Sequence, residues 1–429
     1  MKQYITIGLL CLSTIRLQAQ DAELKNLINK SFSYFPQFRE LNQAVQTEQD
    51  RVLEIKASGL PGLAANGSYT YNHPVSEITI PVSGAEALTF GIMPNNNYQA
   101  GLNASYTLWD FGTVKANVAR AKLAVQYAKD NVEQNKTQMA FQVSTLYYQM
   151  IYLQKAIAIQ DSVLRFLEAN KKDTEVKLKH GDALKYDVLS IQSNIAQEYN
   201  RKIDLQNTLN KQINLLQYTT GVESANGNTF DFMPFNPVKE EMTLTAAQNN
   251  NWEFKLLNDR IKQAESDYTV SSKSGKPSLS LNAGTGYSNG YTPDIDQFRY
   301  RYSAGVSLHI PIYEGGRSDK KIKVAQSMLK QTQLGYETLS NRYMKDIRQS
   351  MNDIKSNQSS LLNAQTQVDE AKEAQKLAQS RYKNGTGTNL ELTNASTNVQ
   401  RASLTLLQYD FQLCLAKLEL ARLAGIVYW

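Results

Sequence analysis

The stretch LKHGDALKYDVL, residues 178–189, interrupts more than 100 residues that contain no proline and have helical patterning. Glycine readily takes the left-handed backbone conformation that ends a helix, and an aspartate just after it can cap the next helix. Gly181 is therefore predicted to end one helix, and Asp182 to cap the next. The stretch predicts a reversal between two long helices.

A second copy of this turn lies 204 residues further along the chain. At this one offset, three pairs of glycines coincide: Gly112 with Gly316, Gly181 with Gly385, and Gly221 with Gly425. Between the first two pairs, apolar residues recur every seven positions in the same phase in both halves: Val143, Met150, Ile157 and Leu164 fall on Ile347, Ile354, Leu361 and Val368. Seven residues is the coiled-coil interval. The chain is therefore an internal duplication, in which Gly385 ends the second long helix and Thr386 or Thr388 caps the next.

Nearer the start of each half the offset becomes 216, since Phe38 falls on Phe254 and Pro61 on Pro277. The change of offset from 216 to 204 therefore lies between Pro61 and Gly112, where the stretch HPVSEITIPVSGAEALTFGIMPNNN contains three prolines. Loops absorb insertions of this kind. This stretch is predicted to be a loop. Each half then has one order: helix, strand, loop, strand, very long helix, glycine turn, helix.

The N-terminus, MKQYITIGLLCLSTIRLQAQ, has a lysine, a short apolar core and a plausible cleavage site at LQA, as a secretory signal peptide does. No run of about 20 apolar residues follows it, so no helical membrane span is expected. Only Cys414 then remains in the mature chain, and we expect it to be a buried small hydrophobe.

These observations predict the organisation of the whole chain. A signal peptide is predicted over 1–20, a linker or equatorial segment over 221–243, and a tail over 426–429. The first repeat, over 21–220, has a helix over 23–58, strands over 63–72 and 98–108, a long helix over 113–179 and a helix over 183–220. The second repeat, over 244–425, has a helix over 244–273, strands over 279–288 and 299–310, a long helix over 316–383 and a helix over 388–423.

The predicted strands alternate between apolar and small polar residues. In 98–108 one set is Tyr98, Ala100, Leu102, Ala104, Tyr106 and Leu108, and the other is Gln99, Gly101, Asn103, Ser105 and Thr107. Such alternation fits a soluble sandwich or the wall of a transmembrane barrel, whose strands are about 9–11 residues long. The small polar set favours a water-filled lumen. Trp109 and Tyr313, just beyond two strand ends, fit an interfacial aromatic girdle.

A barrel requires several copies of the chain. Four strands cannot enclose a wide lumen, and an open sheet edge is not permitted in lipid. Two copies give 8 strands, whose interior side chains fill, and three copies give 12, with room for a channel, so that three is the preferred number. The two long helices have about 67 residues each, or about 100 Å, which exceeds the bilayer thickness and requires them to project into water. The sequence thus predicts a mixed, mainly α fold, in which a trimeric 12-stranded barrel continues into a long α-helical barrel.

These features closely resemble the TolC-type outer-membrane efflux proteins, over about residues 23–425. The resemblance rests on the duplicated order, on WDFG and YEGG where strands meet helices, and on HGDALKYDVL and NGTGTNLELTN at the turns. It implies a homotrimer in the outer membrane with a periplasmic extension. It also implies a passive exit duct in a tripartite efflux or type I secretion system, docked with a periplasmic adaptor and an inner-membrane transporter of RND or ABC type.

The resemblance also implies roles for residues. Adaptor contact is expected at Gly181, Asp182, Gly385 and Thr386, and the barrel-to-helix junction at Trp109, Gly112, Tyr313 and Gly316. Glu391 and Asn394 fall where the family has a ring of acidic gate residues, and Asp187 where a residue braces the neighbouring helix. The chain departs from the family where Asn394 is neutral and where Gly387 replaces a bracing arginine. Asp187 and Glu391 also fit a simpler interpretation, because the helix macrodipole favours acidic residues at helix N-termini.

Other classes of function receive little support. The formal net charge is +6, without a basic stripe interleaved with aromatics, which disfavours nucleic-acid binding. The three histidines lack metal-ligand spacing, and no catalytic triad or phosphate loop is present, so no enzyme, metal or cofactor is expected. The remaining alternative is a soluble periplasmic coiled-coil adaptor or scaffold.

Overall fold

The computed structural model describes residues 22–81, 83–84, 86–225, 227, 229–230, 232 and 239–429. The predicted signal peptide over 1–20 and parts of the predicted linker lie outside these residues. The chain forms two compact units. The first contains the residues up to Gln43, Lys129–Leu257 and Gly335–Trp429, and the second contains Ala44–Ala128 and Asn258–Leu334.

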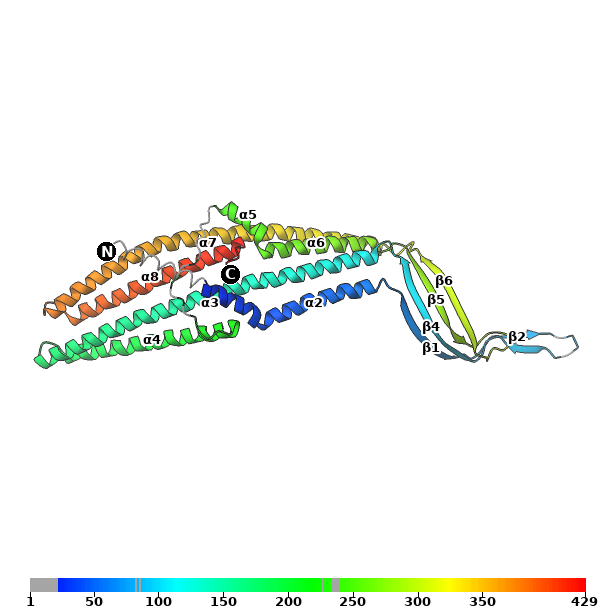
Figure 1. The fold of residues 1–429 in the computed structure, drawn as a ribbon, viewed down its shortest axis with the longest axis horizontal. Coiled ribbons are helices and arrows are strands. Elements are labelled where there is room, and N and C mark those ends of the chain that lie inside the picture. Colours follow the sequence, from blue (N-terminus) through cyan, green and yellow to red (C-terminus); the bar gives the residue numbers. More distant parts are fainter. Residues whose placement is uncertain are drawn as a thin grey trace, which may run out of the picture. The chain divides into compact units, whose positions relative to one another are not determined.

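The second unit contains a four-stranded antiparallel sheet in the order β1-β4-β5-β6 (Figure 1). Its strands are β1 (Gly62–Tyr71), β4 (Asn96–Trp109), β5 (Ser278–Ser288) and β6 (Arg299–His309). All four predicted strands are therefore present in the structure. The two halves of the duplication meet where β4 pairs with β5, and β1 and β6 are the free edges.

The register of the sheet sorts its side chains into two chemically distinct faces. One face carries the apolar set from every strand, as in the row Leu63, Ala104, Ala283 and Ala304 and the row Tyr69 and Tyr98. The opposite face carries serine, threonine, asparagine and glycine, together with Arg299, Arg301 and His309 of β6. The alternation seen in single strands is thus continuous across the whole sheet.

The stretch predicted as a loop contains a second, smaller sheet. β2 (Glu77–Ile80) and β3 (Leu88–Gly91) form an antiparallel hairpin between β1 and β4. The prediction of a loop here was wrong. The segments EITI and LTFG are too short to stand out among the surrounding prolines, but they alternate and are rich in β-branched residues, which suits strands.

Four helices continue from the strands and the glycine turns: α3 (Thr113–His180), α4 (Lys185–Thr220), α7 (Arg317–Lys383) and α8 (Asn389–Ala424). The two long helices have 68 and 67 residues. Among the helices of the described residues, none has an apolar stretch of the length needed to cross a membrane.

Two helices that the sequence predicts to be continuous are divided in the structure. The first is helical over 22–34, bends at Phe35 and resumes as α2 (Pro36–Ala57). Proline disfavours the helical conformation of the residue before it, which accounts for the bend. The second is divided into α5 (Glu240–Asn250) and α6 (Trp252–Lys273) by Asn251, whose backbone is extended.

The heptad residues form the core of the first unit. Val143 and Met150 of α3 are buried in one cluster with α4 and α8, and Ile347 and Ile354 of α7 are buried in another with α5, α6 and α8. Helix α8 contributes to both clusters, Leu418 to the first and Leu420 to the second. Cys414 is buried in the first cluster, as expected.

Ile347→Ala should lower the free energy of unfolding by about 3 kcal/mol, because truncating a fully buried isoleucine removes apolar contacts and leaves a cavity. Lys355→Ala, at an exposed position of the same helix, should change it by less than about 0.5 kcal/mol. Denaturant unfolding in detergent, followed by circular dichroism, measures both. Equal effects would contradict the heptad core.

Candidate functional site: the two helical turns

Both long helices end with the same backbone geometry, at the same end of the first unit (Figure 1). Gly181 and Gly385 have positive φ angles of 85° and 72°. Just after each glycine, Asp182 N–H donates to the Lys177 carbonyl at 2.8 Å, and Thr386 N–H donates to the Arg381 carbonyl at 2.9 Å. This is the bond pattern of a Schellman motif, which requires the left-handed residue that glycine provides.

The helices that follow the turns are capped by different residues. Leu184 is the N-cap of α4, and the Asp187 carboxylate accepts a hydrogen bond from its N–H at 3.1 Å. The prediction that Asp182 caps this helix was wrong. At α8, Thr388 is the N-cap, and its hydroxyl accepts from Glu391 N–H at 3.2 Å. The hydroxyl of Thr386 instead donates to the Arg381 carbonyl.

The predicted gate residues lie close together beside the turns. Asp187 and Asn394 line one groove, between α4 and α8, and Glu391 and Asn394 line another, between α7 and α8. In the second groove, Glu391 forms an ion pair at 3.5 Å with Arg381. The two side chains are 47% and 60% exposed, so the pair contributes less than about 1 kcal/mol to stability.

The structure gives a reason for one departure from the family pattern. Gly387 lies against the end of α7, where an added Cβ would come within 2.9 Å of the Cβ of Arg381. A larger side chain would therefore displace the turn. The arginine that faces Glu391 comes instead from the last turn of α7.

Buried polar contacts that the sequence did not reveal join the two halves near the turns. The Tyr382 hydroxyl of α7 shares a hydrogen bond of 2.8 Å with the Thr174 hydroxyl of α3. The Lys177 ammonium donates to the backbone carbonyl of Tyr382 at 2.5 Å. Asn170 of α3 donates to the Asn389 side chain of α8 at 2.9 Å. The counterpart of Tyr382 in the first half is a leucine, so comparing the repeats does not reveal this link.

Further from the turns, a buried polar layer connects α3, α4 and α8. The Gln160 amide donates to the Glu198 carboxylate at 2.6 Å, and the Gln400 amide donates to Gln160 at 3.1 Å and to Glu198 at 2.8 Å. The three residues are at most 7% exposed. Arg201 forms an ion pair with the same carboxylate at 2.6 Å. Since buried polar groups need partners, this layer fixes α8 in one register against α3 and α4.

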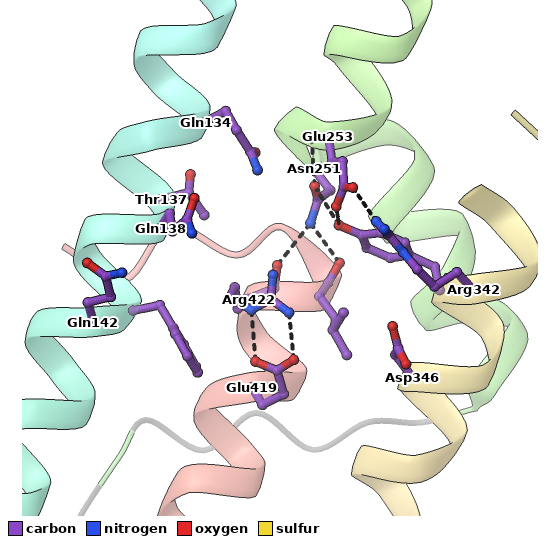
Figure 2. Close-up of a pocket in the computed structure, with 13 residues that line it drawn as sticks. Gln134, Thr137, Gln138, Gln142, Asn251, Glu253, Arg342, Asp346, Glu419 and Arg422 are labelled. Carbon is purple, nitrogen blue, oxygen red and sulfur yellow. Dashed lines mark hydrogen bonds and ion pairs between the residues drawn. The ribbon is translucent and has the colours of Figure 1, made fainter. Parts of the chain in front are cut away.

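A polar pocket of about 660 Å³ in the first unit, lined by α3, α6, α7 and α8, is shown in Figure 2. Asn251 donates to the carbonyls of Arg422 and Leu423, and accepts from Tyr343 and from Glu253 N–H. It thereby ties the start of α6 to the end of α8.

The charged side chains of this pocket are paired with one another. Glu253 accepts from Arg342, and Glu419 holds Arg422 through two hydrogen bonds of 2.6 and 2.8 Å (Figure 2). Burial, together with the charge of Glu253, raises the pKa of the Tyr343 phenol above its ordinary value. We interpret the pocket as a structural junction.

The predicted barrel-to-helix junction residues lie in the second unit. Trp109 ends β4 and is 60% exposed, and Gly112 and Gly316 have positive φ angles of 84° and 74° just before the long helices. Tyr313 is also exposed. A residue that the prediction missed is Asp110, whose carboxylate accepts from the N–H groups of Gly112 and Val114 and so caps α3. An aspartate just before a helix, as in the motif WDFG, is a capping signal that can be recognised in the sequence.

The model of a known family, described as outer membrane efflux protein, matches residues 27–222 and 243–426. The chain belongs to this family. The match falls in two segments, one for each half of the duplication. The chain is therefore an outer-membrane efflux channel of the TolC type, which is a transport protein and not an enzyme. Within the described residues, no cluster of three His, Cys, Asp or Glu side chains could hold a metal ion.

This efflux protein is similar to curated relatives over most of its length. It is 24% identical to outer membrane protein TolC of Vibrio cholerae, covering 89% of this chain and 86% of the relative. It is 21% identical to outer membrane protein TolC of Escherichia coli, covering 98% and 85%.

Solved structures share its fold. The outer-membrane channel OprN aligns with a TM-score of 0.77 at 16% identity, covering 95% of this chain and 91% of that one. The outer membrane protein VceC of Vibrio cholerae aligns with a TM-score of 0.75 at 16% identity, covering 95% and 97%.

Gln400→Met, which keeps the length of the side chain, should lower the free energy of unfolding by about 2 kcal/mol, because the buried Glu198 carboxylate and the Gln160 side chain each lose one hydrogen bond. Asn398→Ala, at an exposed position of α8, should have little effect. Denaturant unfolding of both variants tests this. Wild-type stability of Gln400→Met would show that the layer does not hold α8.

Proposed function

We propose that this efflux channel is a homotrimer whose three sheets close into one 12-stranded barrel, with the helices extending into the periplasm as a tunnel. The observation that carries the proposal is the four-stranded sheet with two free edges, β1 and β6. In hydrocarbon, the peptide groups of a free edge have no partner, and each unpaired group costs several kcal/mol. An outer-membrane chain with such a sheet must therefore pair its edges with other copies.

The geometry of the sheet suits this closure. Because the sheet is antiparallel and has an even number of strands, β6 runs opposite to β1. The β1 strand of a neighbouring copy can thus continue the antiparallel order beside β6. The apolar face then lies toward lipid, and the face with serine, asparagine and glycine lines a water-filled lumen, as transmembrane barrels require.

The proposed duct conducts passively and receives its substrates from partner proteins. A periplasmic adaptor and an inner-membrane transporter, of RND or ABC type, would supply substrates for efflux or for type I secretion. Contact with the adaptor is proposed at the turns, Gly181 with Asp182 and Gly385 with Thr386. Apolar side chains next to the turns support it, since Leu184, Tyr186 and Leu390 are 68–74% exposed.

The proposed gate is at the same turns. Glu391 lies in the first turn of α8, and three copies around one axis would form a negative ring in a narrow opening, an arrangement that selects cations. Asn394 lies one turn further on and adds no charge. Asp187 is proposed to hold the start of α4 in place beside α8, since it caps α4. It also lines the groove between α4 and α8, together with Asn394.

Mass measurement tests the trimer. Light scattering of the protein in detergent, with the detergent mass subtracted, should give three chains per particle. A single chain per particle would contradict the closed barrel.

Glu391→Ala should raise single-channel conductance or lower cation preference in planar bilayers, because it removes the proposed negative ring. Glu373→Ala, an exposed acid of α7 with its own lysine partner, should leave both unchanged. Thermal unfolding of Glu391→Ala should separate the gate role from a helix-end role. Because the exposed pair with Arg381 contributes little to stability, a pure gate role leaves the melting temperature unchanged, whereas a helix-end role lowers it. Unchanged conductance and selectivity would remove Glu391 from the gate.

A further inference from the structure

The hairpin of β2 and β3 has one wholly apolar face. Ile78 lies opposite Phe90, and Ile80 lies opposite Leu88, so that these four side chains share one side of the hairpin. We call them the apolar hairpin face. On the other side, the Thr79 and Thr89 hydroxyls share a hydrogen bond of 3.1 Å. An amphipathic strand pair of this kind normally covers something with its apolar side.

No part of the chain that the structure describes covers this face. Its four side chains are 48–53% exposed. Two strands of four residues each are also too short to be stable alone in water, since an isolated hairpin is at best marginal. The hairpin therefore needs another surface for its stability.

The position of the hairpin argues against a lipid partner. Asn72 N–H donates to the Asn95 carbonyl, and Ile92 N–H donates to the Ser76 carbonyl, which joins the hairpin to the end of β1 and β4. That end of the sheet carries a group of tyrosines, namely Tyr69, Tyr71, Tyr98, Tyr287, Tyr300 and Tyr302. Clustered tyrosines mark the boundary between membrane and water. The hairpin projects beyond them (Figure 1), on the water side of that boundary.

The origin of the hairpin in the sheet points to its partner. It follows directly after β1, which is a free edge of the sheet. In the proposed trimer this edge meets a neighbouring copy, so that each hairpin begins at a seam between two chains. The most direct apolar surface at that place is the equivalent hairpin of the next copy.

The hairpins are long enough to meet. Twelve strands spaced about 4.8 Å apart and tilted by about 40° give a barrel radius of about 12 Å. The segment from Asn72 to Ile80, at about 3.3 Å per residue, reaches at most about 27 Å. Three hairpins can therefore contact one another above the barrel opening.

We propose that the apolar hairpin faces of three copies of this chain pack together at the outer mouth of the channel, where they form an apolar collar. This inference rests on the proposed trimer. The collar would bury Ile78, Ile80, Leu88 and Phe90 from each copy and leave the threonine side in water. It makes the outer mouth an interface between copies, separate from the paired strands of the barrel.

Cysteine accessibility tests the collar. Phe90→Cys and Ile80→Cys place a thiol on the apolar hairpin face, and Thr89→Cys places one on the opposite side as a matched control. Two positions on the apolar face guard against a local effect of one substitution. The native Cys414 is 2% exposed, and the unsubstituted chain measures its background. The trimer in lipid vesicles is treated with a water-soluble polyethylene glycol maleimide, with denatured protein as the reference for full access.

The new thiols of Phe90→Cys and Ile80→Cys are expected to react at least tenfold more slowly than that of Thr89→Cys. Oxidation should also link two chains in at least one of the two apolar-face variants. Equally fast labelling on both sides would overturn the collar. Protection without any link between chains would also overturn it, because another surface must then be the cover.

A further variant separates the lipid alternative. In Phe90→Trp, the added tryptophan fluorescence, relative to the unsubstituted chain, should not be quenched by brominated phospholipids. Quenching would identify lipid as the occupant and overturn the collar. Light scattering of the same variants in detergent keeps the two hypotheses apart. A trimer in which the Phe90→Cys thiol is accessible contradicts the collar alone, whereas a monomer contradicts the trimer as well.

Discussion

The absence of hydrogen-bonding partners in hydrocarbon is the constraint on which this structure depends. A sheet with an unpaired strand at each side cannot remain in a membrane as it is, because every open peptide group would lose its water. The duplication supplies two pairs of strands per chain, and the register places all large apolar side chains on one face. The proposed closure with other copies rests on these two facts together with the outer-membrane location of the family.

The first unit must hold together helices that are polar over much of their surface. These helices pack along narrow apolar stripes. The heptad residues of α3 and α7 supply two such stripes, and α8 lies between them. Toward the turns the contacts become polar, first in the layer of Gln400 with Gln160 and Glu198. Next to the turns, Tyr382 contacts Thr174. Polar contacts depend on alignment more than apolar ones do, which suits a region where helices must keep a defined position.

Features set by local sequence could be predicted. The alternation along each strand, the glycines at 181 and 385 and the heptad spacing each require only neighbouring residues, and they located four strands and four helices correctly. The short hairpin of β2 and β3 was missed because its strands have only four residues each. The cap at α4 was assigned to Asp182 because it directly follows the glycine, whereas the turn extends to Leu184 and places Asp187 at the helix start.

The rest depended on contacts between distant parts of the chain. The link from Asn170 to Asn389 spans 219 residues, and that from Gln160 to Gln400 spans 240. Glutamines and asparagines are abundant along these helices, so the buried ones do not stand out in the sequence. The three-dimensional packing alone selects them.

The double role of α8 has a consequence for folding. Two sides of this one helix are buried in different clusters, Leu418 in the first and Leu420 in the second. The first cluster is completed by Leu407, Cys414 and Leu418 of α8, so the first half of the duplication has no complete core when the second half melts. The buried residues of the second cluster, in contrast, all come from the second half. The two copies of one ancestral fold are thus coupled in one direction: unfolding of the second half exposes the core of the first, whereas the second half carries a core of its own.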